Sequence, residues 1–219
     1  MKIHLQREIE QLKKRLFHLS ALVEQSLKLA LRAVETSDSD LAAEVRDRDR
    51  EIDRLEVSVE EECLKTLALH QPVAVDLRFL IAVLKMNNDL ERIGDLAVNI
   101  ASGRGCMGAD SMPPTFTEGL HSMGEKAQSM LRMAMESLMA MDTAKAREVL
   151  ASDDAVDAQY RELMTFLRGE LGRRPEDSDK LVCWLLVCKN LERVADQATN
   201  IAEDTIYTVE GAIIRHGGN

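Results

Sequence analysis

The sequence predicts an all-α fold of two tandem three-helix bundles related by internal duplication, and three observations support it. Apolar residues recur at helical spacing almost throughout, and no segment alternates with a period of two for long enough to indicate a strand. Aromatic residues make up only 3% of the 219 residues and Pro occurs 4 times, which favours helix over sheet. A segment of the first half also recurs in the second half with similar residues at the same spacing.

The first three predicted helices span about residues 3–34, 41–69 and 73–102. The first carries an apolar residue every three or four positions and is followed by capping residues at 36–40. The second stops before Pro72, because the residue that precedes a Pro avoids the helical region. A stretch rich in Gly and Pro follows the third, so we predict a first bundle at 1–103 and a linker at 104–114.

The second half, residues 115–219, contains the other three predicted helices. The fourth spans about 116–141, and Asp142 is positioned to cap a fifth that reaches about residue 171. Residues 172–175 contain Gly and Pro and break the pattern. Capping residues at 177–179 then predict a sixth helix that reaches about residue 215.

The duplication is visible in two alignments. Residues 90–101 match residues 191–202 at an offset of 101, and Asp38, Asp49 and Asp53 fall on acidic residues of the second half at an offset of 104. Each half is then a three-helix unit that is too small to be very stable alone, so we expect the halves to pack together.

The formal net charge is −10, which excludes some classes of partner. Nucleic acids and anionic lipid surfaces both attract basic faces, so neither is an expected partner. No stretch of about 18 apolar residues is present, and the N-terminus lacks the apolar segment of a signal peptide. We therefore expect a cytoplasmic protein without direct membrane insertion.

Paired carboxylates at i, i+4 are the chemically most informative feature. Such pairs project from one side of a helix, about 6 Å apart, and here they border the apolar stripe instead of opposing it. An Asn continues the row one turn later in the third and sixth helices. The candidate metal-ligating residues are Asp49, Asp53, Glu91, Asp95, Asn99, Asp153, Asp157, Glu192, Asp196 and Asn200.

Like charges at this spacing repel, and a shared cation would relieve both the repulsion and the lost hydration. Oxygen ligands without clustered His or Cys suit Mg²⁺, Ca²⁺, Mn²⁺ or carboxylate-bridged iron. One alternative is a metal-free helical scaffold whose acids are solvated and neutralised by Arg50, Arg54, Arg92 and Arg193. Another is a carboxylate-bridged dimetal enzyme, although such a site normally includes His ligands and no nucleophile–base pair is visible. We expect a protein that is not an enzyme.

Four stretches of the sequence form recognisable motifs. Residues 71–78 read QPVAVDLR and residues 89–95 read DLERIGD in the first half, and residues 191–196 read LERVAD and residues 200–203 read NIAE in the second. These motifs resemble those of the two halves of the PhoU family of phosphate-uptake regulators. The resemblance covers essentially the whole chain and extends to the six-helix plan.

This resemblance implies an all-α protein that binds iron or zinc clusters through E/DxxxD motifs, which here are Asp49/Asp53, Glu91/Asp95, Asp153/Asp157 and Glu192/Asp196. It implies a negative regulator of phosphate uptake and of the phosphate-starvation response. Such a protein links the ATPase of a phosphate ABC transporter to a sensor histidine kinase, commonly as a homodimer. The second half departs from the pattern at Ala195, where Gly is usual, and at residues 175–180, so we expect unequal metal occupancy of the halves.

Overall fold

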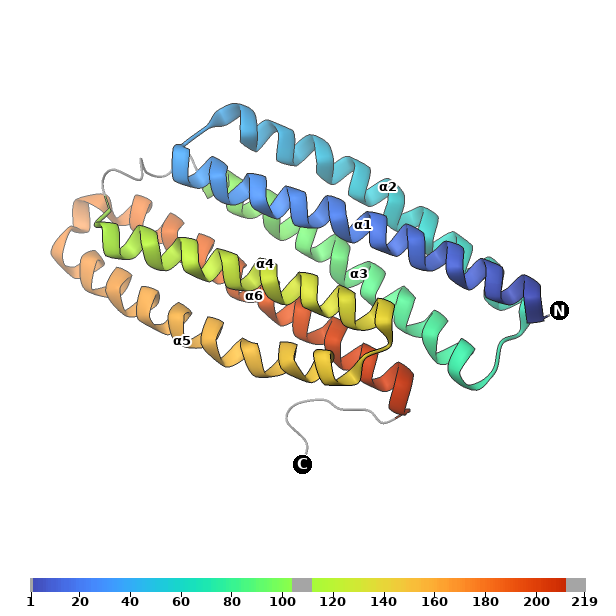
Figure 1. Cartoon of the computed structure of the whole chain (residues 1–219). Coiled ribbons are helices and arrows are strands. Elements are labelled where there is room, and N and C mark those ends of the chain that lie inside the picture. The colour runs from blue at the N-terminus through green and yellow to red at the C-terminus, as the bar shows by residue number, and fades with distance from the viewer. Residues whose placement is uncertain (1, 104–111, 212–219) are drawn as a thin grey trace.

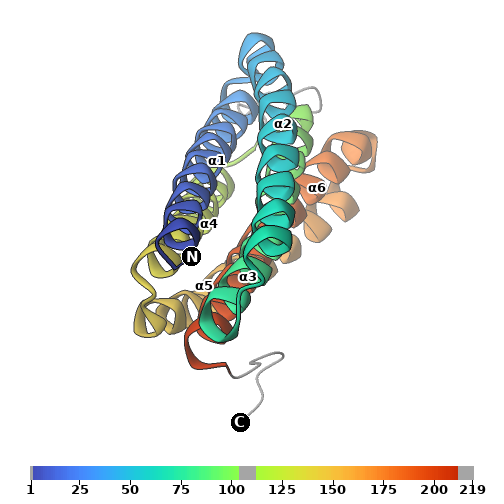
Figure 2. The ribbon, with the colours of Figure 1, turned by 90° about the vertical axis from the view of Figure 1, so that its right-hand side faces the viewer.

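Six α-helices make up nearly all of the computed structural model, which describes residues 2–103 and 112–211. No strand occurs within those residues, so the predicted all-α class is confirmed. The helices run along a common long direction and reverse at each turn (Figures 1 and 2). None of the described helices is both long and apolar enough to cross a membrane.

The first half consists of α1 (Lys2–Thr36), α2 (Ser39–His70) and α3 (Ala74–Ser102), each of which packs against the other two. The side chain of Asp38 accepts hydrogen bonds from the backbone of Asp40 and Leu41 and thereby caps α2. At the other end of α2, Gln71 takes φ of 45° immediately before Pro72. The break between the second and third helices therefore lies next to Pro72, as predicted.

The second half repeats this arrangement with α4 (Pro114–Ala140), α5 (Thr143–Arg173) and α6 (Ser178–Glu210). Asp142 caps α5, as predicted, by accepting from the backbone of Ala144 and Lys145. A single 3₁₀ turn, Pro175–Asp177, leads into α6, and Asp177 makes no capping hydrogen bond there.

The sixth helix ends earlier than the sequence pattern predicts. It stops at Glu210 instead of about residue 215, because Gly211 takes φ of 72° and its N–H donates to the carbonyl of Tyr207. Gly adopts this left-handed conformation without the steric cost of a side chain and commonly ends helices in this way.

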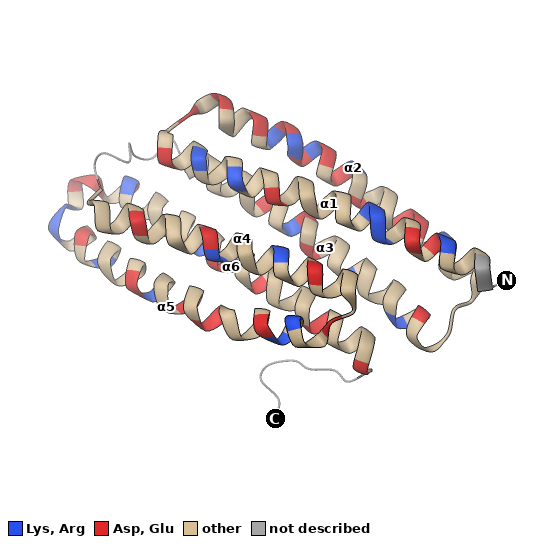
Figure 3. Ribbon diagram, viewed as in Figure 1, with Lys and Arg blue, Asp and Glu red and all other residues tan. Residues whose placement is uncertain are grey.

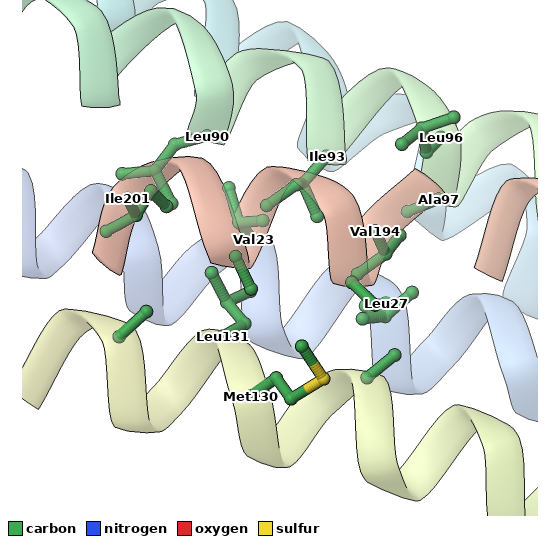
Figure 4. Close-up of a cluster of buried hydrophobic side chains, with 14 of the residues drawn as sticks. Val23, Leu27, Leu90, Ile93, Leu96, Ala97, Met130, Leu131, Val194 and Ile201 are labelled. Carbon is green, nitrogen blue, oxygen red and sulfur yellow. The ribbon is translucent and has the colours of Figure 1, made fainter. Parts of the chain in front are cut away.

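The two halves pack together through α3 against α6, supported by α1 against α4. Figure 4 shows the apolar side chains of these four helices interleaved in one buried cluster. Leu90 and Ile93 of α3, Val23 of α1 and Val194 of α6 are each inaccessible to solvent. The outer helices α2 and α5 pack chiefly against their own half, so the contacts of α2 with α3 and of α5 with α6 belong to separate halves.

Candidate metal centre

The first candidate site lies along the contact of α2 with α3, and we call it the first seam. It contains Asp49 and Asp53 of α2 together with Glu91 and Asp95 of α3. Burial raises the pKa of Asp49 to about 6, with further contributions from the charges of Asp53 and Asp95. The pKa of Glu91 is also raised, first by burial and then by the charges of Asp95 and Asp53. The two i, i+4 pairs of this half therefore face one another across the two helices.

A close approach of the helices partly buries this seam. A Cβ atom on Gly94 would lie 3.3 Å from Oδ1 of Asp49 and from two carbons of Ile52. Because Gly94 has no side chain, α3 can approach α2 closely next to the carboxylate of Asp49. That Oδ1 atom is inaccessible to solvent and has no hydrogen-bond partner among the described residues. Such a buried oxygen is costly unless it is protonated or paired, and a cation would satisfy it.

The second seam lies along the contact of α5 with α6 and contains Asp153, Asp157, Glu192 and Asp196. Burial raises the pKa of Asp153 to about 6, and the charges of Asp157 and Asp196 add to this rise. The pKa of Asp196 is raised for the same reasons, burial first and then the charge of Glu192. The four acids of the second half therefore also face one another.

Arginine acts on these seams without forming a salt bridge within the described residues: the charge of Arg92 opposes the rise in the pKa of Glu91, and the charge of Arg193 opposes the rise in the pKa of Asp196. Arg50 pairs with Asp47 at 3.1 Å, and Arg92 pairs with Asp89 at 3.8 Å, so neither forms a salt bridge with a seam acid. Within the described residues, the only salt bridge of the eight seam carboxylates joins Nζ of Lys189 to Oε2 of Glu192 at 2.5 Å. Figure 3 shows acidic positions recurring along the outer helices α2 and α5. In the described part of the chain, the acids of the first seam thus have no salt-bridge partner.

The carboxylates do not form a closed ligand cage. Across residues 2–103 and 112–211, no three His, Cys, Asp or Glu side chains are placed so that they could together hold a metal ion. The donor chemistry nevertheless fits a hydrated divalent cation, since Mg²⁺ keeps several waters and often binds through one or two carboxylates. Such an ion would satisfy the buried oxygen and the facing acids without a preformed cage.

The two predicted Asn ligands lie elsewhere, in clefts between α3 and α6. Asn200 lines a cleft of about 510 Å³ together with Asp89, Arg92 and the ion pair of Lys85 with Asp204, whose charged atoms are 2.7 Å apart. Asn99 lines a second cleft, of about 380 Å³, at the other end of the same contact. These clefts lie between the two halves, whereas each seam lies within one half.

Sequence reasoning missed two residues that extend the first seam. The amide of Asn87, one turn before Glu91, donates to the backbone oxygen of Glu56 at 2.9 Å and to its Oε1 at 3.0 Å. The charge of Glu56 in turn contributes to the raised pKa of Glu91. The only signal in the sequence was the spacing of Asn87, Glu91 and Asp95 at i, i+4, i+8. This spacing does not show which residues of α2 face these positions, so it could not identify Glu56.

Comparison with known proteins identifies relatives along nearly the whole chain. The PhoU domain family model matches twice, at residues 16–103 and 120–205, which agrees with the internal duplication. The "Phosphate-specific transport system accessory protein PhoU homolog" of Pseudomonas aeruginosa is 34% identical over 215 residues, which cover 96% of this chain and 87% of the relative. The accessory protein PhoU of Escherichia coli K12 is 31% identical, with the same coverage of 96% and 87%.

Two crystal structures have the same fold. PhoU from Pseudomonas aeruginosa superposes with a TM-score of 0.89 at 32% identity and covers 94% of this chain and 99% of its own. The "phosphate transport system regulatory protein PhoU" from Streptococcus pneumoniae gives a TM-score of 0.89 at 28% identity, with coverage of 97% and 100%. The six-helix arrangement is therefore shared with PhoU proteins of two bacteria.

Proposed function

The chain belongs to the PhoU family, and from this premise we propose that it is an accessory protein that regulates a phosphate transport system. The names of relatives that match it over most of their length support this role. The similar crystal structure from Streptococcus pneumoniae is that of a phosphate transport system regulatory protein. The expected action is negative: the protein restrains phosphate uptake and the phosphate-starvation response when phosphate is plentiful.

The finer mechanism that we propose is that of an adaptor without catalytic activity of its own, acting as a homodimer. One partner is the ATPase of a phosphate ABC transporter and the other is a sensor histidine kinase. Exposed apolar side chains around the turn between α2 and α3 support a role in protein contacts, since exposed apolar clusters often mark interaction sites. They are Leu64, Leu69, Val73, Val75, Leu77 and Ile81.

Affinity capture from cells grown with abundant phosphate tests the adaptor. We expect the tagged protein to retain the transporter ATPase and the sensor kinase, and cells that lack the protein to express phosphate-starvation genes constitutively. Failure to retain either partner, together with normal repression in the deletion strain, would contradict the adaptor.

Cation binding at the seams is the second part of the proposal. The observation that carries it is the buried Oδ1 of Asp49, which has no hydrogen-bond partner among the described residues although the charges of Asp53 and Asp95 act on it. A bound divalent cation supplies positive charge that holds the two helices of a seam together. The resemblance favours iron or zinc, and the oxygen donors also suit Mg²⁺, Mn²⁺ or Ca²⁺.

Elemental analysis of protein purified without added metal tests this part. We expect bound metal in the wild type and its loss when Asp95→Ala and Asp196→Ala are combined, with the helical content retained. If the wild type holds no metal after purification and takes up none of the five candidates on dialysis, the seams are solvated faces and the scaffold alternative holds.

A carboxylate-bridged dimetal enzyme is the alternative function. It is favoured only by the facing carboxylates, and a His ligand would normally be expected among them. Hydrolysis of simple phosphoesters or consumption of oxygen by the metal-loaded protein, abolished by Asp95→Ala, would establish it in place of the adaptor.

A further inference from the structure

The molecule has a broad face formed by α1 and α4, which contact one another and lie in front of α3 and α6 in Figure 3. On this face α1 exposes a row of residues at helical spacing, at positions 11, 14, 18, 25, 28 and 32. We call it the basic row, because its charged members are Lys14, Lys28 and Arg32 and it contains no acid. These three side chains make no hydrogen bond or salt bridge with another described residue. Such unpaired cations are unexpected on a chain whose formal net charge is −10.

The duplicated helix α4 exposes the opposite charge on the same face. At an offset of 104, Glu118 and Glu136 occupy the positions of Lys14 and Arg32. A third acid, Glu125, stands where α1 has an alanine, and all three acids are exposed. We call these three the acidic row. Two helices that repeat one another in sequence therefore differ in the sign of their exposed charge.

Part of the acidic charge is offset within the chain. Glu136 forms a salt bridge with Lys145 of α5 at 2.8 Å, and Glu125 lies 3.4 Å from Nε2 of His121. The side chain of Glu118 makes no hydrogen bond or salt bridge with another described residue. The acidic row therefore keeps negative charge that the chain does not neutralise.

Two contacts fix the register of α1 against α4. A Cβ atom on Gly124 would lie 2.7 Å from a methyl carbon of Leu31, and Nδ1 of His121 is 2.8 Å from Oε1 of Glu35. Later residues of α1 thus lie beside earlier residues of α4, and the two helices run antiparallel.

This register brings opposite charges to the same level along the face. Glu125 of α4 lies level with the turn of α1 between Lys28 and Arg32. Arg132, the one cation among the positions of α4 equivalent to the basic row, lies level with Glu24, and its charge lowers a pKa that burial of Glu24 raises. The sequence of charges along α1 therefore complements the sequence along α4.

We propose that this face is the contact surface between two copies of the chain, with α1 of each copy on α4 of the other. The inference rests on the proposed homodimer and adds which surface forms it and in which orientation. A two-fold axis that runs between the two helices and parallel to them exchanges α1 and α4 and keeps every residue at its own level. Glu125 of one copy then meets Lys28 and Arg32 of the second copy.

The charge difference between the halves selects this orientation. Because the halves repeat one another, a two-fold axis running across the helices would give a contact of similar shape, with α1 on α1 and α4 on α4. That contact would place the two basic rows against each other, and like charges facing across an interface oppose binding. The reversed signs of the rows therefore act against the alternative orientation as well as in favour of the proposed one.

An exposed apolar group on α1 can add to the contact. Phe17 has 54% of its surface exposed and occupies, at an offset of 104, the position of His121. By the same register it lies level with Met139 of α4, which is partly buried. In the proposed dimer Phe17 of each copy covers this part of α4 of the other.

Reversal of the charges in the full-length chain tests the contact. Glu125→Lys alone, and Lys28→Glu with Arg32→Glu, should each weaken the dimer in sedimentation equilibrium. We expect a loss of about a hundredfold, because each of two symmetric contacts changes from attraction to repulsion and is worth about tenfold. All three substitutions in one chain restore opposite charges and should return the affinity to near that of the wild type.

A mixture of the two altered chains separates contact between copies from contact within one chain. Each altered chain alone should be mainly monomeric, whereas the mixture should form heterodimers, which native mass spectrometry distinguishes by mass. Glu61→Lys, at an exposed position of α2, is the control and should leave the dimer unchanged. Circular dichroism checks that every variant remains helical.

Three results would overturn the inference. If the reversals leave the dimer unchanged, or if the chain with all three substitutions dimerises as weakly as the separate variants, the contact lies elsewhere while the proposed homodimer stands. If the wild-type chain sediments as a monomer at every concentration, the inference and the proposed homodimer are both wrong.

Discussion

Gly124 shows how a single missing side chain sets the distance between the two halves. It lies on α4 against α1, and a Cβ atom there would be 2.7 and 2.9 Å from the two methyl carbons of Leu31, which is itself buried. We expect Gly124→Ala to destabilise the protein by about 1 kcal/mol. Overpacking costs about 1–3 kcal/mol, and the gain in helix propensity returns only about 1 kcal/mol.

Gly169 is the matched control for this substitution. It lies inside α5, and nothing would come within 4 Å of its added Cβ. Gly169→Ala should stabilise the protein by roughly 0.5–1 kcal/mol, because only the propensity gain remains. Denaturant unfolding of both variants measures the two changes, and a stabilising Gly124→Ala would show that Leu31 moves aside without cost.

Asp89 makes the stability depend on pH. It is 7% exposed at the contact of α3 with α6, and burial, followed by the charge of Asp204, raises its pKa to about 6. The pKa in the unfolded chain is about 3.9, so between these values the folded state holds a proton that the unfolded state has lost. The stability contributed by this group is therefore full below about pH 4 and is lost as the pH rises through 6.

Replacement of Asp89 by Asn tests this direction. At pH 7 we expect Asp89→Asn to be more stable than the wild type by roughly 1–2 kcal/mol, with the difference vanishing near pH 4. Thermal unfolding across pH 4–8 measures it, with Glu51→Gln, an exposed position on α2, as the control. Parallel curves for wild type and Asp89→Asn would show that Asp89 titrates normally.

Site residues could be predicted from the sequence where the pattern that marks them lies within one helix. The pairs at i, i+4 were visible because both carboxylates stand on one helix, and the repeat made them stand out. The roles of Glu56 and Asn87 depend on the register of α2 against α3, which one sequence does not reveal. Asn99 and Asn200 follow the acidic pairs by four residues in sequence. Because four residues are slightly more than one helical turn, each such step rotates the row around the helix, and both Asn residues line clefts between α3 and α6.

At the scale of the helices, three described helices have Asp at the N-cap position, and the side chains of Asp38 and Asp142 make capping hydrogen bonds whereas that of Asp177 does not. Oδ1 of Asp38 accepts from two backbone N–H groups at 2.8 and 3.2 Å, and Oδ1 of Asp142 does so at 2.9 and 3.1 Å. Asp38→Ala and Asp142→Ala should each cost about 1 kcal/mol, measured by urea unfolding.

Two controls make this prediction specific to the caps. Asp38→Asn should be nearly neutral, because Asn caps as well as Asp. Asp177, at the start of α6, makes no capping bond and instead pairs with Lys180 at 3.0 Å, so Asp177→Ala should cost less than about 0.5 kcal/mol. Equal losses at Asp142 and Asp177 would indicate that general charge effects, and not capping, stabilise these helices.

Helix boundaries were predictable where a residue type forces the backbone and not elsewhere. Pro72 and the caps Asp38 and Asp142 set the ends near them, and the structure agrees within one or two residues. The sixth helix was predicted too long because residues 212–214 continue the apolar character of the helix, whereas Gly211 already ends it. A single Gly outweighs such a pattern because it leaves the helical conformation at no steric cost.

For the whole molecule, the decisive feature is that the two halves share one core. The apolar face of α3 packs against α6 as well as against its own bundle, and α1 likewise meets α4. The sequence showed apolar faces on these helices without showing which of them served the contact between halves. Helix period alone does not distinguish a face buried within a bundle from one buried between bundles.

A shared core predicts that the chain unfolds as one unit. Separation of the halves would expose Leu90, Ile93 and Val194, which are inaccessible in the intact chain. Exposing apolar surface costs about 25 cal/mol per Å², so exposing these side chains would cost several kcal/mol, which is a large part of the stability of a small domain.

Calorimetry of the whole chain should therefore show a single transition, and fragment 1–103 alone should unfold at a much lower temperature. Mixing it with fragment 112–219 should restore helical stability through association of the two. A fragment 1–103 that melts at the temperature of the intact chain would mean that each half is stabilised by its own core and that the contact between α3 and α6 adds little.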